Sequence, residues 1–251
     1  MQWRRHISFF LNSQQKVRSG ARYRDITLVC TDMAVYQSLV RLVFGRMGIP
    51  VYQSGTEEIL QKSVVATVMN GLEAALSGFE QKNTLRYLRS ALSPLSQDLC
   101  DEVENYAVVW AIHGKKWLEE WKNHPEGLSG IWRQETDQQL ARLNEGRTAA
   151  LVPLEKLRKG LADAKNLHEH VLALYGFLVD LELERRLAEL AQELDAAGDN
   201  RSAQILNQLW EILISALEQL HDTLGETAWE PEHFVRLLRL LLSQYDVGTI
   251  P

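Results

Sequence analysis

Two short groups of polar residues are of the types that catalyse reactions or hold ions. His168, Glu169 and His170 could ligate a metal, and Asp163 with Lys165 has the Asp-x-Lys form of some nucleases. Side chains two positions apart on a helix point about 200° apart, so the two histidines are poorly placed to share one ion. Asp163 and Lys165 lie in a helical pattern with no acidic strand beside them, which favours a chance match. We assign no catalytic or metal-binding residue.

A phosphate-binding loop is missing from this sequence. The nearest segment, Gly114-Lys115-Lys116, lacks the upstream glycine and the hydroxyl with which such a loop holds phosphates and magnesium. Cys30 and Cys100 are far apart and belong to no Cys-x-x-Cys pair. We therefore expect no zinc site and no disulfide framework, but two buried, apolar cysteines in a reducing cytoplasm. ATP binding by this chain alone is not expected, and no cofactor is predicted.

Positive charge gathers in two places, where DNA phosphates could bind. Residues 1–50 hold eight Arg and Lys against two Asp, a net charge of +6, and the rest of the chain carries −12. A second group of lysines lies between Gly114 and Gly130. The candidate phosphate contacts are Arg22, Arg24, Lys115, Lys116 and Lys122. The alternative is that these side chains only solvate the surface.

The segment from Gly114 to Gly130 is predicted to be an ordered loop with tryptophans around it. They are Trp110, Trp117, Trp121 and Trp132. Aromatic rings interleaved with cations can stack nucleic-acid bases while the cations hold phosphates. The same rings can instead pack together to order the loop, and we favour this second interpretation.

The elements that position these residues differ along the chain. Residues 25–30 and 49–52 are short apolar, β-branched runs, and helical periodicity lies between them. Strand, helix and strand within about 30 residues predict a βαβ unit with two parallel strands. Because a parallel sheet normally has more strands and is covered on both faces, this sheet is incomplete.

After the second predicted strand, apolar residues recur at helical spacing and no clear strand is visible. The pattern predicts about eight helices. Pro153 is expected near the start of one, and Asn166 with Glu169 has the form of a capping box. A bend is expected near Leu181, and Pro231 is expected to begin the last helix. The predicted fold class is mainly α, with a partial α/β layer followed by a helical bundle.

The segments around the predicted strands come in a distinctive order. They are residues 20–32 (GARYRDITLVCTD), Tyr36 and Gly48-Ile49-Pro50-Val51-Tyr52. This series resembles the second motor domain of superfamily 1 helicases of the UvrD/Rep type. In those helicases a strand, a helix and a Gly-Ile-Pro strand lead into an inserted helical domain called 2B.

Segments further along the chain make the resemblance more specific than superfamily 1 helicases in general. They are Glu104-Asn105-Tyr106, residues 112–117 (IHGKKW), residues 203–225, Glu232-His233-Phe234 and Gly248-Thr249-Ile250-Pro251. Their order and spacing resemble the AddB (RexB) subunit of the bacterial AddAB-type (RexAB-type) ATP-dependent helicase–nucleases, over nearly the whole chain. In that family the phosphate loop lies upstream of the matching region, and the nuclease carboxylates and iron–sulfur cysteines lie downstream. The chain is therefore expected to be an internal fragment to which no catalytic residue is carried over.

The resemblance implies a division of the chain. Residues 1–54 would form a partial RecA-like α/β unit, the first half of motor-like domain 2A. Residues 55–245 would form a helical 2B-like insertion domain, and residues 246–251 would begin the return to the motor-like domain.

The resemblance also implies a function for the parent complex. That complex would be a cytoplasmic helicase and exonuclease that uses ATP, magnesium and an iron–sulfur cluster to process double-strand DNA breaks for recombination and repair. The fragment would not be an enzyme by itself. It would scaffold the heterodimer with the other subunit of the helicase–nuclease, AddA, and help to guide DNA.

A second hypothesis is a stand-alone helical protein-interaction module that binds no DNA. DNA affinity that falls steeply with salt would favour the first hypothesis. No membrane partner is expected, because no apolar run approaches the roughly 18 residues that a bilayer requires. The content of 45% hydrophobic and 24% charged residues is ordinary for a globular protein.

Overall fold

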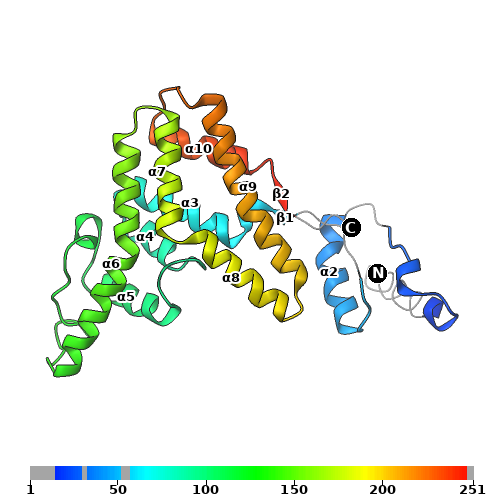
Figure 1. Ribbon diagram of the computed structural model, residues 1–251. Helices are drawn as coiled ribbons and strands as arrows, with labels where there is room; N and C mark the ends of the chain where they lie inside the picture. The colour runs from blue at the N-terminus through cyan, green and yellow to red at the C-terminus, as the bar shows by residue number, and fades with distance from the viewer. Residues whose placement is uncertain (1–14, 30–32, 52–56, 248–251) are drawn as a thin grey trace. The chain divides into compact units, whose positions relative to one another are not determined.

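The computed structural model describes residues 15–29, 33–51 and 57–247 (Figure 1). The chain divides into two compact units. One comprises Met1–Gly55 with Gly248–Pro251, and the other comprises Thr56–Val247. Each unit has its own apolar cluster, the larger one in the second unit.

The first unit is organised around helix α2. Its described elements are a helical stretch over residues 15–18, the 3-10 turn η1 (Tyr23–Asp25) and α2 (Met33–Arg46). Val40 and Phe44, one helical turn apart, are buried together with Ile49 beyond the end of the helix. Gly48, with φ 63°, takes the left-handed conformation that favours glycine after a helix. The helix predicted between the two apolar runs is confirmed.

The two parallel strands predicted in this unit are not confirmed. Residues 26–29 and 49–51 pair with no strand in the part of the chain that the structure describes. Cys30 and Tyr52, which end the two runs, lie outside the described residues. The physical reason is visible at Val29, whose side chain is 83% exposed. Two strands without covering layers bury too little apolar surface to hold a parallel pair together.

The second unit is mainly helical, as the sequence predicts. Its helices are α3 (Ser63–Leu76), α4 (Gln81–Leu88), α5 (Gln97–Val109), α6 (Gln134–Asp163), α7 (Leu167–Asp180), α8 (Leu183–Ala196), α9 (Asn200–Leu224) and α10 (Pro231–Leu242). Shorter elements are η2 (Ile59–Gln61), η3 (Gly114–Trp117), β1 (Glu57–Glu58) and β2 (Asp246–Val247). β1 and β2 are antiparallel, with Glu57 opposite Val247. The sequence did not predict this pair.

Helix α3 lies at the centre of the second unit. It packs against α4, α6, α9 and α10 (Figure 1), and nine of its 14 residues are buried. The side chains of Val64, Val68 and Leu72 are fully buried. At Gly71 an added Cβ would lie 2.8 Å from ring atoms of Phe177 on α7. Only glycine therefore allows this ring to approach the helix backbone.

The longer helices pack side by side in two pairs, α6 with α7 and α8 with α9 (Figure 1). The chain turns between α7 and α8 at Glu182, which takes a left-handed conformation with φ 51°. The neighbouring Leu181 and Leu183 are buried and hold this turn in the core. The bend predicted near Leu181 is confirmed.

Side-chain caps begin three of these helices. At the start of α5 the Ser96 hydroxyl accepts a hydrogen bond from the Leu99 N–H. The Asn166 Oδ1 atom accepts a hydrogen bond from the Glu169 N–H at 3.0 Å, and the Asp199 Oδ1 atom accepts one from the Ser202 N–H at 3.1 Å. The Glu169 carboxylate accepts a bond from the Lys165 N–H at 2.7 Å, one residue before the position that a capping box uses. The prediction that Pro231 begins the last helix is also confirmed.

The prediction that Pro153 lies near the start of a helix is wrong, because Pro153 lies inside the 30-residue helix α6. A proline there cannot donate a hydrogen bond to the carbonyl of Ala149, at a cost of about 3 kcal/mol. The side chains around it are buried in the core, and their burial offsets this cost. They are Leu151, Leu154, Leu157 and Leu161.

The loop between α5 and α6 is ordered, as predicted, and a buried arginine of α6 holds it. Arg147 donates from Nη1 to the Trp117 carbonyl at 3.0 Å and from Nε to the Asn144 Oδ1 atom at 3.2 Å. Asn144 also exchanges two 2.9 Å hydrogen bonds with the backbone of Trp121. Burial lowers the pKa of Arg147, which reflects the cost of keeping its charge from water. These hydrogen bonds offset that cost.

We expect Arg147→Ala to lower the free energy of unfolding by about 2–4 kcal/mol, because it leaves the Trp117 carbonyl without its partner and opens a cavity. Urea denaturation measures this loss. Arg142→Ala is the control, since Arg142 lies on the same helix but pairs with Glu102 at the surface. That control should cost less than about 1 kcal/mol, and an equal loss in both variants would contradict the role given to Arg147.

Candidate functional site

The predicted contact Arg24 lies in η1 and Arg22 is the N-cap residue of η1, and the two share one carboxylate. The Nε atoms of Arg22 and Arg24 lie 3.3 and 3.8 Å from the Asp25 carboxylate. The two arginine side chains are 69% and 71% exposed, so solvent screens both ion pairs. Both guanidinium groups remain open to an anion, although Asp25 neutralises one of the two charges.

The lysines of the loop are exposed but do not make it basic. Lys115 and Lys116 are on η3, and Lys122 pairs with Glu120 at 3.3 Å. Lys115 forms no ion pair with any residue that the structure describes. Residues 113–126 hold three lysines and three glutamates, so the loop has no net charge. Phosphate binding there would depend on local geometry and not on a general excess of positive charge.

The tryptophans of this loop mostly pack against one another. Trp117 is fully buried, and Trp121 stacks on Tyr106 with ring centroids 4.4 Å apart and an interplanar angle of 9°. The packing interpretation is thus confirmed for Trp117 and Trp121. Trp132 is half-exposed, and its Nε1 atom donates to the Asp137 carboxylate at 2.8 Å. It is therefore tied to the start of α6.

The histidines near the start of α7 point to different partners. His170 is fully buried, and its Nε2 atom lies 2.8 Å from the Trp229 carbonyl oxygen. The His168 ring meets the His221 ring edge-on, with centroids 4.6 Å apart. Within the described ranges, no three His, Cys, Asp or Glu side chains gather so as to hold a metal ion.

Cys100 behaves as an apolar residue, as predicted. It is buried on α5, and burial, followed by the charges of Asp101 and Glu104, raises the pKa of its thiol. A raised pKa disfavours the reactive thiolate. Cys30 lies outside the described residues.

A groove of about 600 Å³ lies between α3, α4 and α5, and cations gather along it. The residues that line it are Ser63, Ala66, Asn70, Lys82, Leu85, Arg86, Arg89, Ser90, Ala91 and Glu104. None of these residues is among the contacts predicted from the sequence. A signal was present, since Lys82, Arg86 and Arg89 have the i, i+4, i+7 spacing of one helix face.

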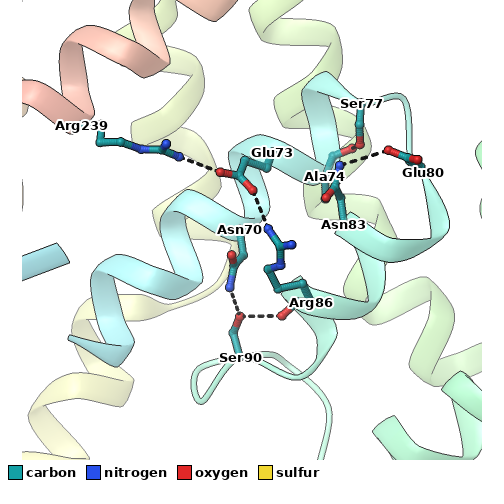
Figure 2. Close-up of polar contacts among 9 residues, drawn as sticks. All are labelled: Asn70, Glu73, Ala74, Ser77, Glu80, Asn83, Arg86, Ser90 and Arg239. Atoms are coloured by element: carbon teal, nitrogen blue, oxygen red, sulfur yellow. Dashed lines mark hydrogen bonds and ion pairs between the residues drawn. The ribbon is translucent and has the colours of Figure 1, made fainter. Parts of the chain in front are cut away.

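Glu73 of α3, which is not itself a lining residue, holds two arginines, and one of them is Arg86 of the groove (Figure 2). The Arg86 Nη1 atom lies 2.9 Å from Glu73 Oε2, and the Nη2 atom of Arg239 on α10 lies 2.6 Å from Oε1. Asn70 donates to the Ser90 hydroxyl at 3.0 Å, and that hydroxyl donates to the Arg86 carbonyl at 3.0 Å. This network ties α4 and α10 to α3 and sets the position of Arg86.

No helix in the described part of the chain has both the length and the apolar character that a bilayer span requires.

No protein-family model matches the chain, but curated proteins match it over most of its length. A protein named as the B subunit of an ATP-dependent helicase/deoxyribonuclease from Caldanaerobacter subterraneus subsp. tengcongensis is 28% identical over 232 residues, 92% of this chain and 20% of that protein. Proteins with the same name from Clostridium botulinum (strain Loch Maree) and Clostridium perfringens (strain 13) are 25% and 29% identical. Each match covers 92% of this chain and 20% or 21% of the relative.

The chain therefore spans about a fifth of the length of the curated relatives that it matches. The resemblance to AddB that the sequence motifs indicated is confirmed by these relatives, which are named as the B subunit of such an enzyme.

Proposed function

We propose that this chain is a non-catalytic segment of the AddB subunit of an ATP-dependent helicase–nuclease that processes double-strand DNA breaks for recombinational repair in the cytoplasm. The observation that carries this proposal is the match over 92% of the chain to proteins named as the B subunit of such an enzyme. The parent complex would use ATP, magnesium and an iron–sulfur cluster. We assign none of these to residues of this chain.

The first unit would be half of a RecA-like motor domain, over residues 1–54. Its exposed apolar side chains support this proposal, because a complete α/β layer would cover them. They are Leu28, Val29, Leu42, Met47 and Val51. The missing strands and helices would come from other parts of a longer polypeptide, in keeping with the lack of a strand partner for the described residues of the two runs.

The second unit would be a 2B-like insertion over residues 55–245, with residues 246–251 beginning the return to the motor domain. The pairing of β1 with β2 supports this proposal, because it places the two ends of the helical unit side by side. A host domain can then accept the unit without a large change in its own chain path. The mechanical role would be to scaffold the heterodimer with AddA and to guide DNA.

We expect the purified chain to bind AddA of the same organism, because a scaffolding segment must contact its partner. Retention of AddA on the immobilised chain measures this, with an unrelated acidic helical protein as the control. A correctly folded chain that retains no more AddA than the control would argue against the scaffolding role.

We expect neither ATP hydrolysis nor nuclease activity from the purified chain, since its sequence holds no phosphate-binding loop and no set of nuclease carboxylates. The measurement is phosphate release and DNA degradation with magnesium present. DNA-stimulated hydrolysis that Lys115→Ala abolishes would overturn the assignment of a non-catalytic segment.

We expect weak DNA binding, with a dissociation constant of about 10⁻⁴–10⁻⁶ M that rises steeply with salt. If the loop contributes, Lys115→Ala/Lys116→Ala weakens binding in fluorescence anisotropy with single- and double-stranded oligomers. Unchanged binding would show that the loop lysines do not contact DNA, and Arg22 and Arg24 would remain the candidate contacts. Absence of binding at low salt would favour the stand-alone protein-interaction module.

A further inference from the structure

The cations of the groove between α3, α4 and α5 form a row. Lys82 and Arg86 are on α4, and Arg89 is its C-cap residue, so all three lie on one face of the helix. With a rise of about 1.5 Å per residue, the row from Lys82 to Arg89 is about 10 Å long. One strand of B-form DNA rises about 3.4 Å per phosphate along the duplex axis, and successive phosphates lie farther apart than this along the strand itself, so the row spans about two phosphates. The length of the row suits a chain of phosphates better than a single phosphate.

The charges around the groove leave a positive excess. The full charges that line it, or that pair with its lining residues, are those of Lys82, Arg86 and Arg89 against Glu73 and Glu104. Three cations thus meet two carboxylates. Lys82 forms no ion pair within the described ranges, so its ammonium group is available to a ligand. This excess stands out because the chain after residue 50 carries a net charge of −12.

The arginines of the row keep unused hydrogen-bond donors. Arg86 contacts Glu73 through Nη1 alone, and a guanidinium group has five N–H donors in total. The side chains of Arg86 and Arg89 are 46% and 60% exposed, so a ligand can reach them. Ser63 and Asn70 add neutral polar groups of the kind that contact phosphates. The carboxylates therefore position the arginines without using all of their donors.

We infer that this groove binds the sugar–phosphate backbone of a DNA strand that passes along α4. The inference rests on the proposed function, in which the segment guides DNA, and it gives that role a defined site. Three further lining residues, Ala66, Leu85 and Ala91, are apolar. Because contacts to the sugar–phosphate backbone carry no sequence information, we expect binding in the groove to be independent of base sequence.

The test compares two double variants of the full chain by fluorescence anisotropy with single- and double-stranded oligomers over a range of salt concentrations. Lys82→Gln/Arg89→Gln removes two charges from the groove. Lys156→Gln/Arg185→Gln removes the same charge from exposed positions on α6 and α8. The single variant Lys82→Gln is included because Lys82 has no ion-pair partner to lose within the described ranges, and thermal unfolding confirms that each variant is folded.

We expect the groove variant to bind double-stranded DNA at least about fivefold more weakly at low salt, and its log–log salt slope to fall by about 1.8, or about 0.9 per lost contact. The Lys82→Gln slope should fall by about 0.9, while the control variant stays within about twofold of the wild type. Equal losses in groove and control variants, or no binding by the wild type, would overturn the inference. Competition by polyglutamate as strong as that by DNA at equal charge would also overturn it, in favour of an acidic protein partner.

Different results contradict the inference about the groove and the proposed function. DNA binding that persists unchanged in the groove variant would contradict the inference that the groove is the DNA-binding site, but it would not contradict the proposed function. If the chain does not retain AddA but still binds DNA through the groove in a salt-sensitive way, the scaffolding role is contradicted. The inference that the groove binds DNA is then still supported.

Discussion

The second unit depends on burying helix α3 from several sides at once. A helix that is apolar around most of its circumference must be covered by neighbours, and each Å² of apolar area removed from water contributes about 25 cal/mol. Gly71 leaves room for one further neighbour, the ring of Phe177 on α7. The polar side chains of Asn70 and Glu73 lie along one edge of the helix. That edge faces α4, so the polar network at the groove follows from the packing of the core.

Local signals in the sequence were enough to predict most helices of this unit. Asp199 caps α9 and Pro231 begins α10 through contacts within one helical turn, which a sequence pattern records. Pro153 misled the prediction because its place inside α6 depends on leucines packed in a core that other helices complete. The predicted pair of strands is not confirmed, for a related reason. Their pairing depends on covering layers that the described residues do not supply.

The candidate site was harder to predict than the helices. Arg22 and the loop lysines were selected because cations cluster there in the sequence, but the loop holds as many glutamates as lysines and Glu120 pairs with Lys122. The row from Lys82 to Arg89 was present as a helical spacing. Its partners come from other helices, and Glu73 also binds Arg239, which is 166 residues away in the sequence. Which cations are neutralised, and which remain available, depends on that tertiary arrangement.

The contact between Glu73 and Arg239 also has a consequence for synthesis of the chain. A ribosome adds about 5–20 residues per second, so α10 emerges roughly 8–33 s after α3 across this separation of 166 residues. During that interval the side of α3 that α10 later covers is open to water and to other nascent chains. The pairing of β1 with β2 is likewise delayed until β2 has been synthesised. The helical unit can close only when its last helix has left the exit tunnel, and until then its exposed apolar surface is prone to aggregation.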